Sequence, residues 1–540
     1  MQKNRFQVDS QLNIIVCAYP QVSSLDISLT DSVFLILHQQ VMFQQKPAYL
    51  STDTSYTVVD TAGHAYTLFF TQLPIVTLSF AQELSDLKQV AYITINDTSK
   101  LSINSHVGIG IRGASSRSWP KKKFDIEFWA DSTGQYTWDV PLFGMRSDKD
   151  WIFEALYNEP LRIRSFTNWQ IWKNSHRLHY ITQEPNARSY ISGKFVEVFI
   201  NGSYRGVYAL TEKIDRKQLK LKKATSTHIE GELFKAYDWA EATKFEACVP
   251  YDSLSEVWSG FELKYPDAED TIYWKDLHSF IDFAVNSSDS VFAEQVKSRF
   301  DFNNAVDYFI FLNLITAYDN SGKNLYIARY HKESPYFFVP WDLDGTWGIF
   351  WDGSPHAFTN VIMTNPFFER LLSIDTLGFK ESLKERWFAL RESTYHRDTL
   401  LAMFKRNMDI LVHNHIYERE HMAWSGYKDD TSAFRVLDAF MNDRLEFLDA
   451  YFRFPGEVIT AIYEEGGLKS TRMYPNPASS LLHIQTHEGP TATVDIYSSE
   501  GKYIEKLEPT HPYTYDISNL DNGLYLIRVQ GQVCKLLVHK

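Results

Sequence analysis

Polar residues able to bind a metal ion flank two apolar segments between residues 317 and 348. The first polar group is DNSGKN at 319–324, and the second is WDLDG at 341–345. The segments LYIARY and YFFVPW between them favour strands, and HKESP at 331–335 is typical of a turn. Such a hairpin would bring together Asp319, Asn324, Asp342 and Asp344. Carboxylate and amide oxygens suit Mg²⁺ or Mn²⁺ rather than a soft metal.

The spacing of these residues allows two explanations. Asp319 precedes Asn324 by five positions, as in the D-x-x-x-x-N of protein-kinase catalytic loops. In those loops the Asp accepts the proton of the substrate hydroxyl, the Asn binds a metal ion, and an Asp after the next strand, here Asp342, binds the metal that bridges the phosphates. Asp and Asn are also common in turns and caps. On spacing alone the turn explanation is favoured.

Further motifs extend this pattern upstream. RGASS at 112–116 is followed by PKK at 120–122, and FVEVFINGSYRGVYALTE spans 195–212. With DNSGKN and PWDLDGTWG they resemble, in order, motifs of the CotH kinase family, which are atypical protein kinases named after a bacterial spore-coat protein. The resemblance covers about residues 73–455. With this resemblance, a catalytic role for Asp319 is favoured over the turn explanation.

The resemblance implies a complete set of site residues for ATP and for Mg²⁺ or Mn²⁺. They are Asp319 as the catalytic residue, Asn324, Asp342 and Asp344 as metal ligands, and Arg112, Lys121, Lys122 and Glu212 as nucleotide contacts. The Asn of the family's R-G-N-S-S motif is Ala114 here, which removes any contact made by its amide.

Several of these residues also have simpler explanations. Lys121 to Lys123 can form a solvated charged run, and Glu212 can form a strand-end salt bridge with Lys213 or Arg216. The family carries an Arg at the position of Arg164, preceded by an acid that is Glu159 here. Which acid pairs with Lys121 or Lys122 stays open.

The elements that must position these residues predict an α+β fold. Residues 1–72 read as a β-rich region. For residues 73–455, the resemblance implies an atypical kinase-like core with a β-rich N-lobe and a helical C-lobe. The Asn201-Gly202 pair predicts a hairpin within 195–214. Residues 273–316 and 366–455 are expected to be helical, as is the segment after Pro160. The aromatic loop 347–355 is expected to pack or to stack on a substrate.

Composition limits the class of protein. The chain has 540 residues, which predicts two to four domains, and a net charge of −13, which argues against a general nucleic-acid binder. Three widely separated cysteines indicate neither a disulfide framework nor a zinc site. The sequence contains no run of eighteen apolar residues, so we expect no transmembrane helix.

The C-terminal part reads as a separate unit. Residues 456–472 form a linker, and 473–540 predict a small β-sandwich. YPNPA at 474–478, IYSSEGK at 496–502, NGLYLI at 522–527 and the final Lys540 resemble the type A sorting domain of type IX secretion, found in Bacteroidetes-type bacteria. The resemblance implies contact with that secretion machinery and a secreted or outer-membrane surface location. Such cargo needs a signal peptide, and the first twenty residues lack its apolar region.

Two functions from different classes remain. The first is transfer of a phosphoryl group from ATP to a protein hydroxyl. The second is a surface binding or adhesion protein on a kinase-like scaffold, which the high aromatic content and the export tail favour. A related transfer, such as nucleotidylation, is a third and weaker hypothesis for the same metal site.

Overall fold

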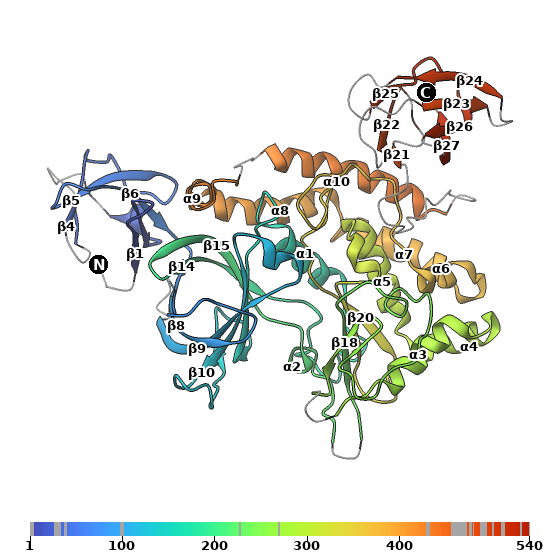
Figure 1. The fold of residues 1–540 in the computed structure, drawn as a ribbon, viewed down its shortest axis with the longest axis horizontal. Coiled ribbons are helices and arrows are strands. Elements are labelled where there is room, and N and C mark those ends of the chain that lie inside the picture. The colour runs from blue at the N-terminus through green and yellow to red at the C-terminus, as the bar shows by residue number, and fades with distance from the viewer. Residues whose placement is uncertain are drawn as a thin grey trace. The chain divides into compact units, whose positions relative to one another are not determined.

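The computed structural model divides the chain into two compact units, Met1–Ile459 and Thr460–Lys540 (Figure 1). It describes all residues except 1–4, 26, 28–33, 37–39, 98–101, 226–227, 268–270, 428–431, 455–471, 475–477, 479, 486–493, 499–501, 509–513, 530–531 and 539–540. The predicted linker at 456–472 lies outside the described residues except for Arg472.

The first unit begins with a six-stranded sheet of order β1-β2-β6-β5-β4-β3. Its strands are β1 (Phe6–Asp9), β2 (Ile14–Ala18), β3 (Phe34–Ile36), β4 (Gln40–Phe43), β5 (Ser55–Asp60) and β6 (Ala65–Thr71), with the short helix η1 (Val22–Ser24) after β2. Strands β2 and β6 run parallel. Ile15 and Cys17 join one hydrophobic cluster, whereas Ile14 and Val16 pack with Tyr204 of the following region. The alternation of β2 thus buries both faces of the sheet.

Seven strands then close a barrel of order β10-β13-β15-β14-β7-β8-β9. They are β7 (Ile75–Ser79), β8 (Gln89–Asn96), β9 (Ser102–Arg112), β10 (Lys123–Trp129), β13 (Asp150–Glu154), β14 (Gly193–Ile200) and β15 (Ser203–Thr211). The short elements η2 (Ser115–Ser118), β11 (Val140–Pro141) and β12 (Ser147–Asp148) connect them. The hairpin predicted within 195–214 is confirmed as β14 and β15. Asn201 and Gly202 have φ of 49° and 81°, as a two-residue hairpin turn requires.

A five-stranded sheet and ten helices complete the described part of the first unit. The sheet has the order β17-β18-β16-β19-β20, with β16 (Glu232–Ala236), β17 (Val257–Trp258), β18 (Phe261–Tyr265), β19 (Leu325–Arg329) and β20 (Tyr336–Pro340). The helices are α1 (Arg164–Ser175), α2 (Arg216–Leu219), α3 (Lys275–Asn286), α4 (Asp289–Arg299), α5 (Phe302–Ile315), α6 (Pro366–Ser373), α7 (Phe379–Arg391), α8 (Arg397–Val412), α9 (Ile416–Ala423) and α10 (Ser432–Tyr451), with the turns η3 (Tyr318–Ser321) and η4 (Asp375–Leu377). The predicted helical stretches are therefore confirmed. Helix α5 is buried from Asn304 to Ile315 and contacts β20.

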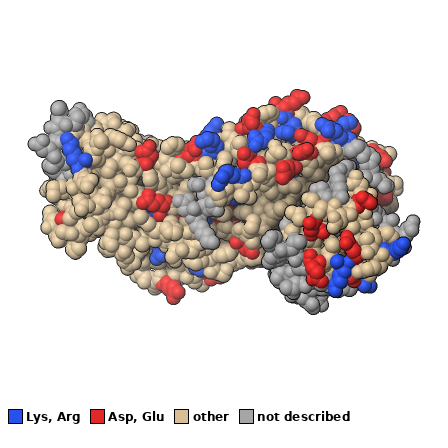
Figure 2. All heavy atoms as spheres, turned by 90° about the horizontal axis from the view of Figure 1, so that it is seen from above, with Lys and Arg blue, Asp and Glu red and all other residues tan. Residues whose placement is uncertain are grey.

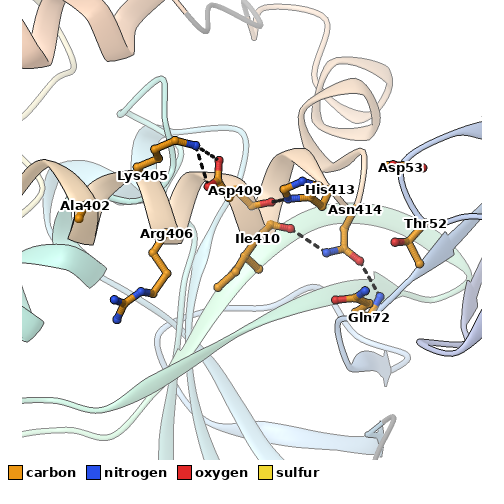
Figure 3. A pocket seen from close by; sticks show the side chains of 10 residues that line it. All are labelled: Thr52, Asp53, Gln72, Ala402, Lys405, Arg406, Asp409, Ile410, His413 and Asn414. Atoms are coloured by element: carbon orange, nitrogen blue, oxygen red, sulfur yellow. Dashed lines mark hydrogen bonds and ion pairs between the residues drawn. The ribbon is translucent and has the colours of Figure 1, made fainter.

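Polar contacts join the N-terminal sheet to α8 beside a hollow of about 600 Å³ (Figure 3). The N–H of Gln72 donates to Asn414 Oδ1 at 2.6 Å, and Asn414 Nδ2 donates to the Ile410 carbonyl at 2.7 Å. Lys405 and Asp409 form an ion pair at 2.9 Å on the same helix. None of the site residues predicted from the sequence lines this hollow.

On the face seen in Figure 2, acidic and basic side chains lie intermingled.

The second unit consists of two small sheets around one core. The strands are β21 (Arg472–Tyr474), β22 (Leu481–Gln485), β23 (Val494–Ser498), β24 (Tyr503–Leu507), β25 (Thr514–Asp516), β26 (Gly523–Val529) and β27 (Gln532–Val538). The sheet orders are β21-β22-β25 and β24-β23-β26-β27. Leu482, Ile496 and Leu536 belong to the common cluster. Parts of the sorting motifs, including Asn476 and Lys540, lie outside the described residues.

Candidate active site

The β19–β20 hairpin brings the predicted catalytic and metal-binding residues to one end. Its register pairs Leu325 with Pro340, so Asn324 and Trp341 face each other just beyond the strands. The Trp341 N–H donates to the Asn324 carbonyl at 3.0 Å. Asn320 Nδ2 donates to the same carbonyl at 2.5 Å and to that of Trp341 at 2.7 Å. Asn320, which the sequence did not single out, thus fixes the end of the hairpin.

Helix α5 and the η3 turn deliver Asp319 to this end. Asp301 caps the start of α5, and Thr316 ends it in the left-handed region, which turns the chain toward η3. Asn324 Nδ2 donates to Asp319 Oδ2 at 3.4 Å. Asn324 and Asp342 have φ of 53° and 50°, a conformation that Asn and Asp tolerate better than most residues. Asn and Asp at these positions therefore fit the positive φ angles and also supply oxygen ligands.

Lys123 is the lysine that reaches the hairpin end. It begins β10, opposite Arg112 of β9, and its side chain is 11% exposed. Its Nζ lies 3.2 Å from Asp342 Oδ1, 3.7 Å from Asp344 Oδ2 and 3.1 Å from Glu154 Oε2. Sequence reasoning assigned the phosphate contact to Lys121 or Lys122 and did not consider Lys123 or Glu154 for the site.

Two further cations lie beside the same hairpin end. The guanidinium carbon of Arg112 lies 5.6 Å from the ring centroid of Trp341, and the Nζ of Lys235, from β16, lies 5.8 Å from it. Burial lowers the pKa of Lys235 to about 8, and the positive charge of Arg112 adds to this effect. The sequence analysis predicted Arg112 as a nucleotide contact, but it did not consider Lys235 as a site residue.

The two carboxyl groups after β20 differ in their tendency to ionise. Burial, together with the adjacent charge of Asp342, raises the pKa of Asp344 to about 7. Burial also acts to raise the pKa of Asp342, but the three surrounding cations outweigh it and hold that pKa below its usual range. One carboxylate therefore stays ionised beside another that resists ionisation until a further positive charge arrives.

The aromatic loop is tied to the site through Asn158. Asn158 Nδ2 donates to Asp344 Oδ2 at 2.9 Å and to the Trp351 carbonyl at 2.6 Å. The indole of Trp347 is fully buried and donates to Asn168 Oδ1 at 2.8 Å, whereas Trp351 is 49% exposed. Of the two roles predicted for the loop, Trp347 packs and Trp351 stays accessible.

Lys121 lies in a buried ion-pair cluster. Its Nζ donates to Glu420 Oε1 and to the Val207 carbonyl, each at 2.6 Å. Arg162 pairs with the other oxygen of Glu420 at 2.9 Å, and the side chains of Lys121 and Glu420 are both 0% exposed. Burial lowers the pKa of Lys121 to about 7. The acid that the sequence left open for this lysine is thus Glu420 of α9.

Two further contacts of buried glutamates, one with a glycine and one with an arginine, stabilise this part of the fold. Gly206 has φ of +83°, and a Cβ there would lie 1.8 Å from Glu420 Oε1, so only glycine permits this approach. Glu159 pairs with Arg164 at 3.2 Å and accepts from the Ile163 N–H at the start of α1. The Glu159–Arg164 pair therefore anchors the helix.

Lys122 and Glu212 lie in different surroundings. Lys122 Nζ donates to the Arg117 carbonyl. Glu212, at the end of β15, is fully buried and accepts from the backbone N–H groups of Arg146 (3.0 Å) and Ser192 (3.1 Å). Its ion-pair partner is Arg188 at 3.3 Å, not Lys213 or Arg216.

The donor set at the hairpin end fits a hard divalent cation. Among the described residues, no three His, Cys, Asp or Glu side chains form a metal-binding group, and the predicted set contributes two carboxylates and the Asn324 amide. Mg²⁺ is usually held by one or two carboxylates together with phosphate oxygens and water. A cation there would also relieve the repulsion between Asp342 and Asp344.

Comparison with known proteins identifies the family. The family model described as CotH kinase protein matches residues 109–448, more than half of the chain. The chain belongs to the CotH kinase family. Inner spore coat protein H of Bacillus subtilis (strain 168) is 22% identical over 305 residues, which cover 56% of this chain and 76% of that protein. Both resemblances stated from the sequence are confirmed, because a secretion system C-terminal sorting domain matches residues 472–538.

The matched regions correspond to distinct parts of the fold. The CotH region begins within β9, so the N-terminal sheet precedes it, and the sorting-domain match spans β21 to β27. Together they indicate a secreted CotH-like protein whose tail addresses the type IX secretion machinery. In the described part of the chain, no helix is both long and apolar enough to cross a membrane.

Proposed function

We propose that the CotH domain transfers a phosphoryl group from ATP to a hydroxyl group of a protein. The observation that carries this proposal is the convergence of Asp319, Asn324 and Asp342 at one hairpin end beside Lys123. Asp319 would orient the acceptor hydroxyl and take its proton. In this proposal the barrel serves as the β-rich lobe and the region around α5 as the helical lobe of a kinase-like arrangement.

Asn324 and Asp342 would hold Mg²⁺ or Mn²⁺, with Asp344 as an additional ligand. When bound, the ion would supply positive charge to the phosphate oxygens. The side chains of the protein would orient the phosphates and the acceptor. Arg112 and Lys123 would orient the phosphates, since their cationic groups lie at the hairpin end. The proposal assigns Lys121 to the buried cluster with Glu420, where it has no exposed surface.

Glu212 and Lys122 have different places in this proposal. Glu212 would support the nucleotide pocket from behind, because its carboxylate oxygens already accept from Arg146, Ser192, Arg188 and Gln218. Lys122 follows η2 and donates to the Arg117 carbonyl, so it would have to exchange that carbonyl for a phosphate oxygen to contact the nucleotide.

The test is transfer of label from ATP in the presence of Mg²⁺ or Mn²⁺. Label from the γ-phosphate on the protein or on candidate acceptors supports phosphoryl transfer, whereas label from the α-phosphate indicates nucleotidylation. Absence of both, without any nucleotide-dependent change in melting temperature, favours the surface-binding scaffold.

Asp342→Asn is expected to weaken metal binding by at least about tenfold, a loss seen even for residues outside the first coordination sphere. Asparagine tolerates the positive φ of 50°, so the change removes charge without straining the backbone. The measurement is titration with Mn²⁺ in the presence of a non-hydrolysable ATP analogue. The control is Asp352→Asn on the nearby aromatic loop, and equal affinity of the two variants would remove Asp342 from the site.

Deleting residues 460–540 is expected to change the unfolding free energy of the remainder by less than about 0.5 kcal/mol. The two compact units have separate hydrophobic cores, so the first loses no core packing. Denaturant unfolding of residues 1–459 and of the full chain gives the comparison. Export assays of the same pair test the sorting role, which fails if the truncated protein is still secreted.

A further inference from the structure

Arg112 and Lys235 approach the same aromatic ring from two different parts of the fold. Arg112 ends β9 of the barrel, and Lys235 lies within β16 of the five-stranded sheet. Both cations lie less than 6 Å from the centroid of Trp341, at 5.6 and 5.8 Å. Trp341 directly precedes Asp342, so this pair of cations borders the candidate metal site.

These cations have little counter-charge of their own. In the described part of the chain, the ammonium group of Lys235 forms no hydrogen bond or ion pair, and the charges of Glu262 and Asp342 act on it only from a distance. The nearest carboxylate oxygen to Arg112 belongs to Asp125, 3.8 Å away. Lys123, in contrast, lies within 4 Å of three carboxyl groups, those of Glu154, Asp342 and Asp344. Two neighbouring cations, neither of which is in close contact with a carboxylate, favour the binding of an anion beside them.

The position of Asp342 indicates what kind of anion this is. Asp342 now shares its negative charge with Lys123, Lys235 and Arg112. A divalent cation on Asp342 would take up that charge and leave Arg112 and Lys235 uncompensated. A ligand with several negative charges can compensate the metal ion and both cations at once. The polyphosphate of a nucleotide is such a ligand.

We propose that Arg112 and Lys235 together bind the polyphosphate of the nucleotide, one from the barrel and the other from the five-stranded sheet. The proposal deepens the phosphoryl-transfer function and rests on it for the identity of the nucleotide. Its new content is that Lys235, which lies outside the barrel, is a phosphate-binding residue. The bound polyphosphate then links β9 to β16 and stabilises their mutual position.

The experiment compares Lys235→Gln with Lys264→Gln in the full chain. Lys264 lies on the neighbouring strand β18, where its charge also acts on Lys235, but it has its own carboxylate partner in Glu262, which makes it a matched control lysine. Binding of inorganic tripolyphosphate with Mg²⁺, and of Mg·ATP, is measured by calorimetry. We expect Lys235→Gln to weaken both about 10- to 100-fold, as loss of a charge-assisted hydrogen bond does, and Lys264→Gln to leave both unchanged. Lys235→Arg should restore most of the binding.

Each outcome has a distinct meaning. Equal tripolyphosphate affinity in Lys235→Gln and the wild type overturns the proposal, as does a wild type that binds no tripolyphosphate. An unchanged Mg·ATP affinity with a raised KM for acidic acceptor peptides also overturns it, because the cations then serve the acceptor. Binding of tripolyphosphate that depends on Lys235, in a wild type that transfers no phosphate, supports this site and refutes the transferase function. Melting temperatures without ligand show whether each variant is folded.

Discussion

Replacing Asp319 by asparagine is expected to lower phosphoryl transfer by about a hundredfold to ten-thousandfold, the usual contribution of a general base. The amide oxygen of asparagine can still accept from Asn324 Nδ2, as the carboxylate does at 3.4 Å. The turn that carries residue 319 is held by backbone bonds from Lys323 and Gly322. The fold and nucleotide binding should therefore persist, while the capacity to accept a proton is lost.

The measurement for this variant is a pair of assays on the same preparation. One follows label transfer from ATP, and the other follows the shift in melting temperature with Mg·ATP. Asp238→Asn is the control, since Asp238 is 62% exposed and lies 3.9 Å from Lys323 on the same side of the hairpin. If Asp319→Asn transfers phosphate as fast as Asp238→Asn, Asp319 only shapes the turn.

Glu420→Ala is expected to reduce the free energy of unfolding by about 3–5 kcal/mol, the usual loss when one partner of a buried ion pair is removed. The Glu420 carboxylate accepts from Lys121 at 2.6 Å and from the Val207 N–H at 2.7 Å, and Arg162 pairs with it at 2.9 Å. Without it, two cations stay buried close together. Glu420→Gln should lose less, because its amide oxygen can replace one acceptor.

Urea unfolding monitored by tryptophan fluorescence measures this loss. Glu418→Ala on the same helix is the control: Glu418 is 40% exposed and pairs with His415, and exposed pairs contribute about 1 kcal/mol at most. A loss for Glu420→Ala no larger than for Glu418→Ala would show that the buried cluster does not hold α9 on the barrel.

The hairpins were predictable because their signals are local. Asn201-Gly202 sets the β14–β15 turn, and residues 331–335 set the β19–β20 turn, each between strands of strong β preference. Once β19 and β20 pair, the residues just outside them must meet. The convergence of Asn324 and Asp342 followed from the chain pattern alone, as did the approach of Asp319.

The lysines were harder to distinguish for a physical reason. Lys121, Lys122 and Lys123 follow one another directly, and no pattern tells which one enters a buried cluster, which one stays at the surface and which one reaches Asp342. The choice depends on Glu420, which is 299 positions from Lys121. Lys235 was missed because it is a single lysine in the apolar strand ELFKA, and nothing in that pattern indicates that it lies beside Trp341 in the fold.

The ion pair between Lys121 and Glu420 also sets an order for folding. A chain emerges N-terminus first during synthesis, so the whole barrel exists before α9 does. Until residue 420 is present, Lys121 and Arg162 lack their counter-charge, and burying them is unfavourable. The barrel can therefore complete its native packing only once α9 is present, a long-range closure of the kind that slows folding.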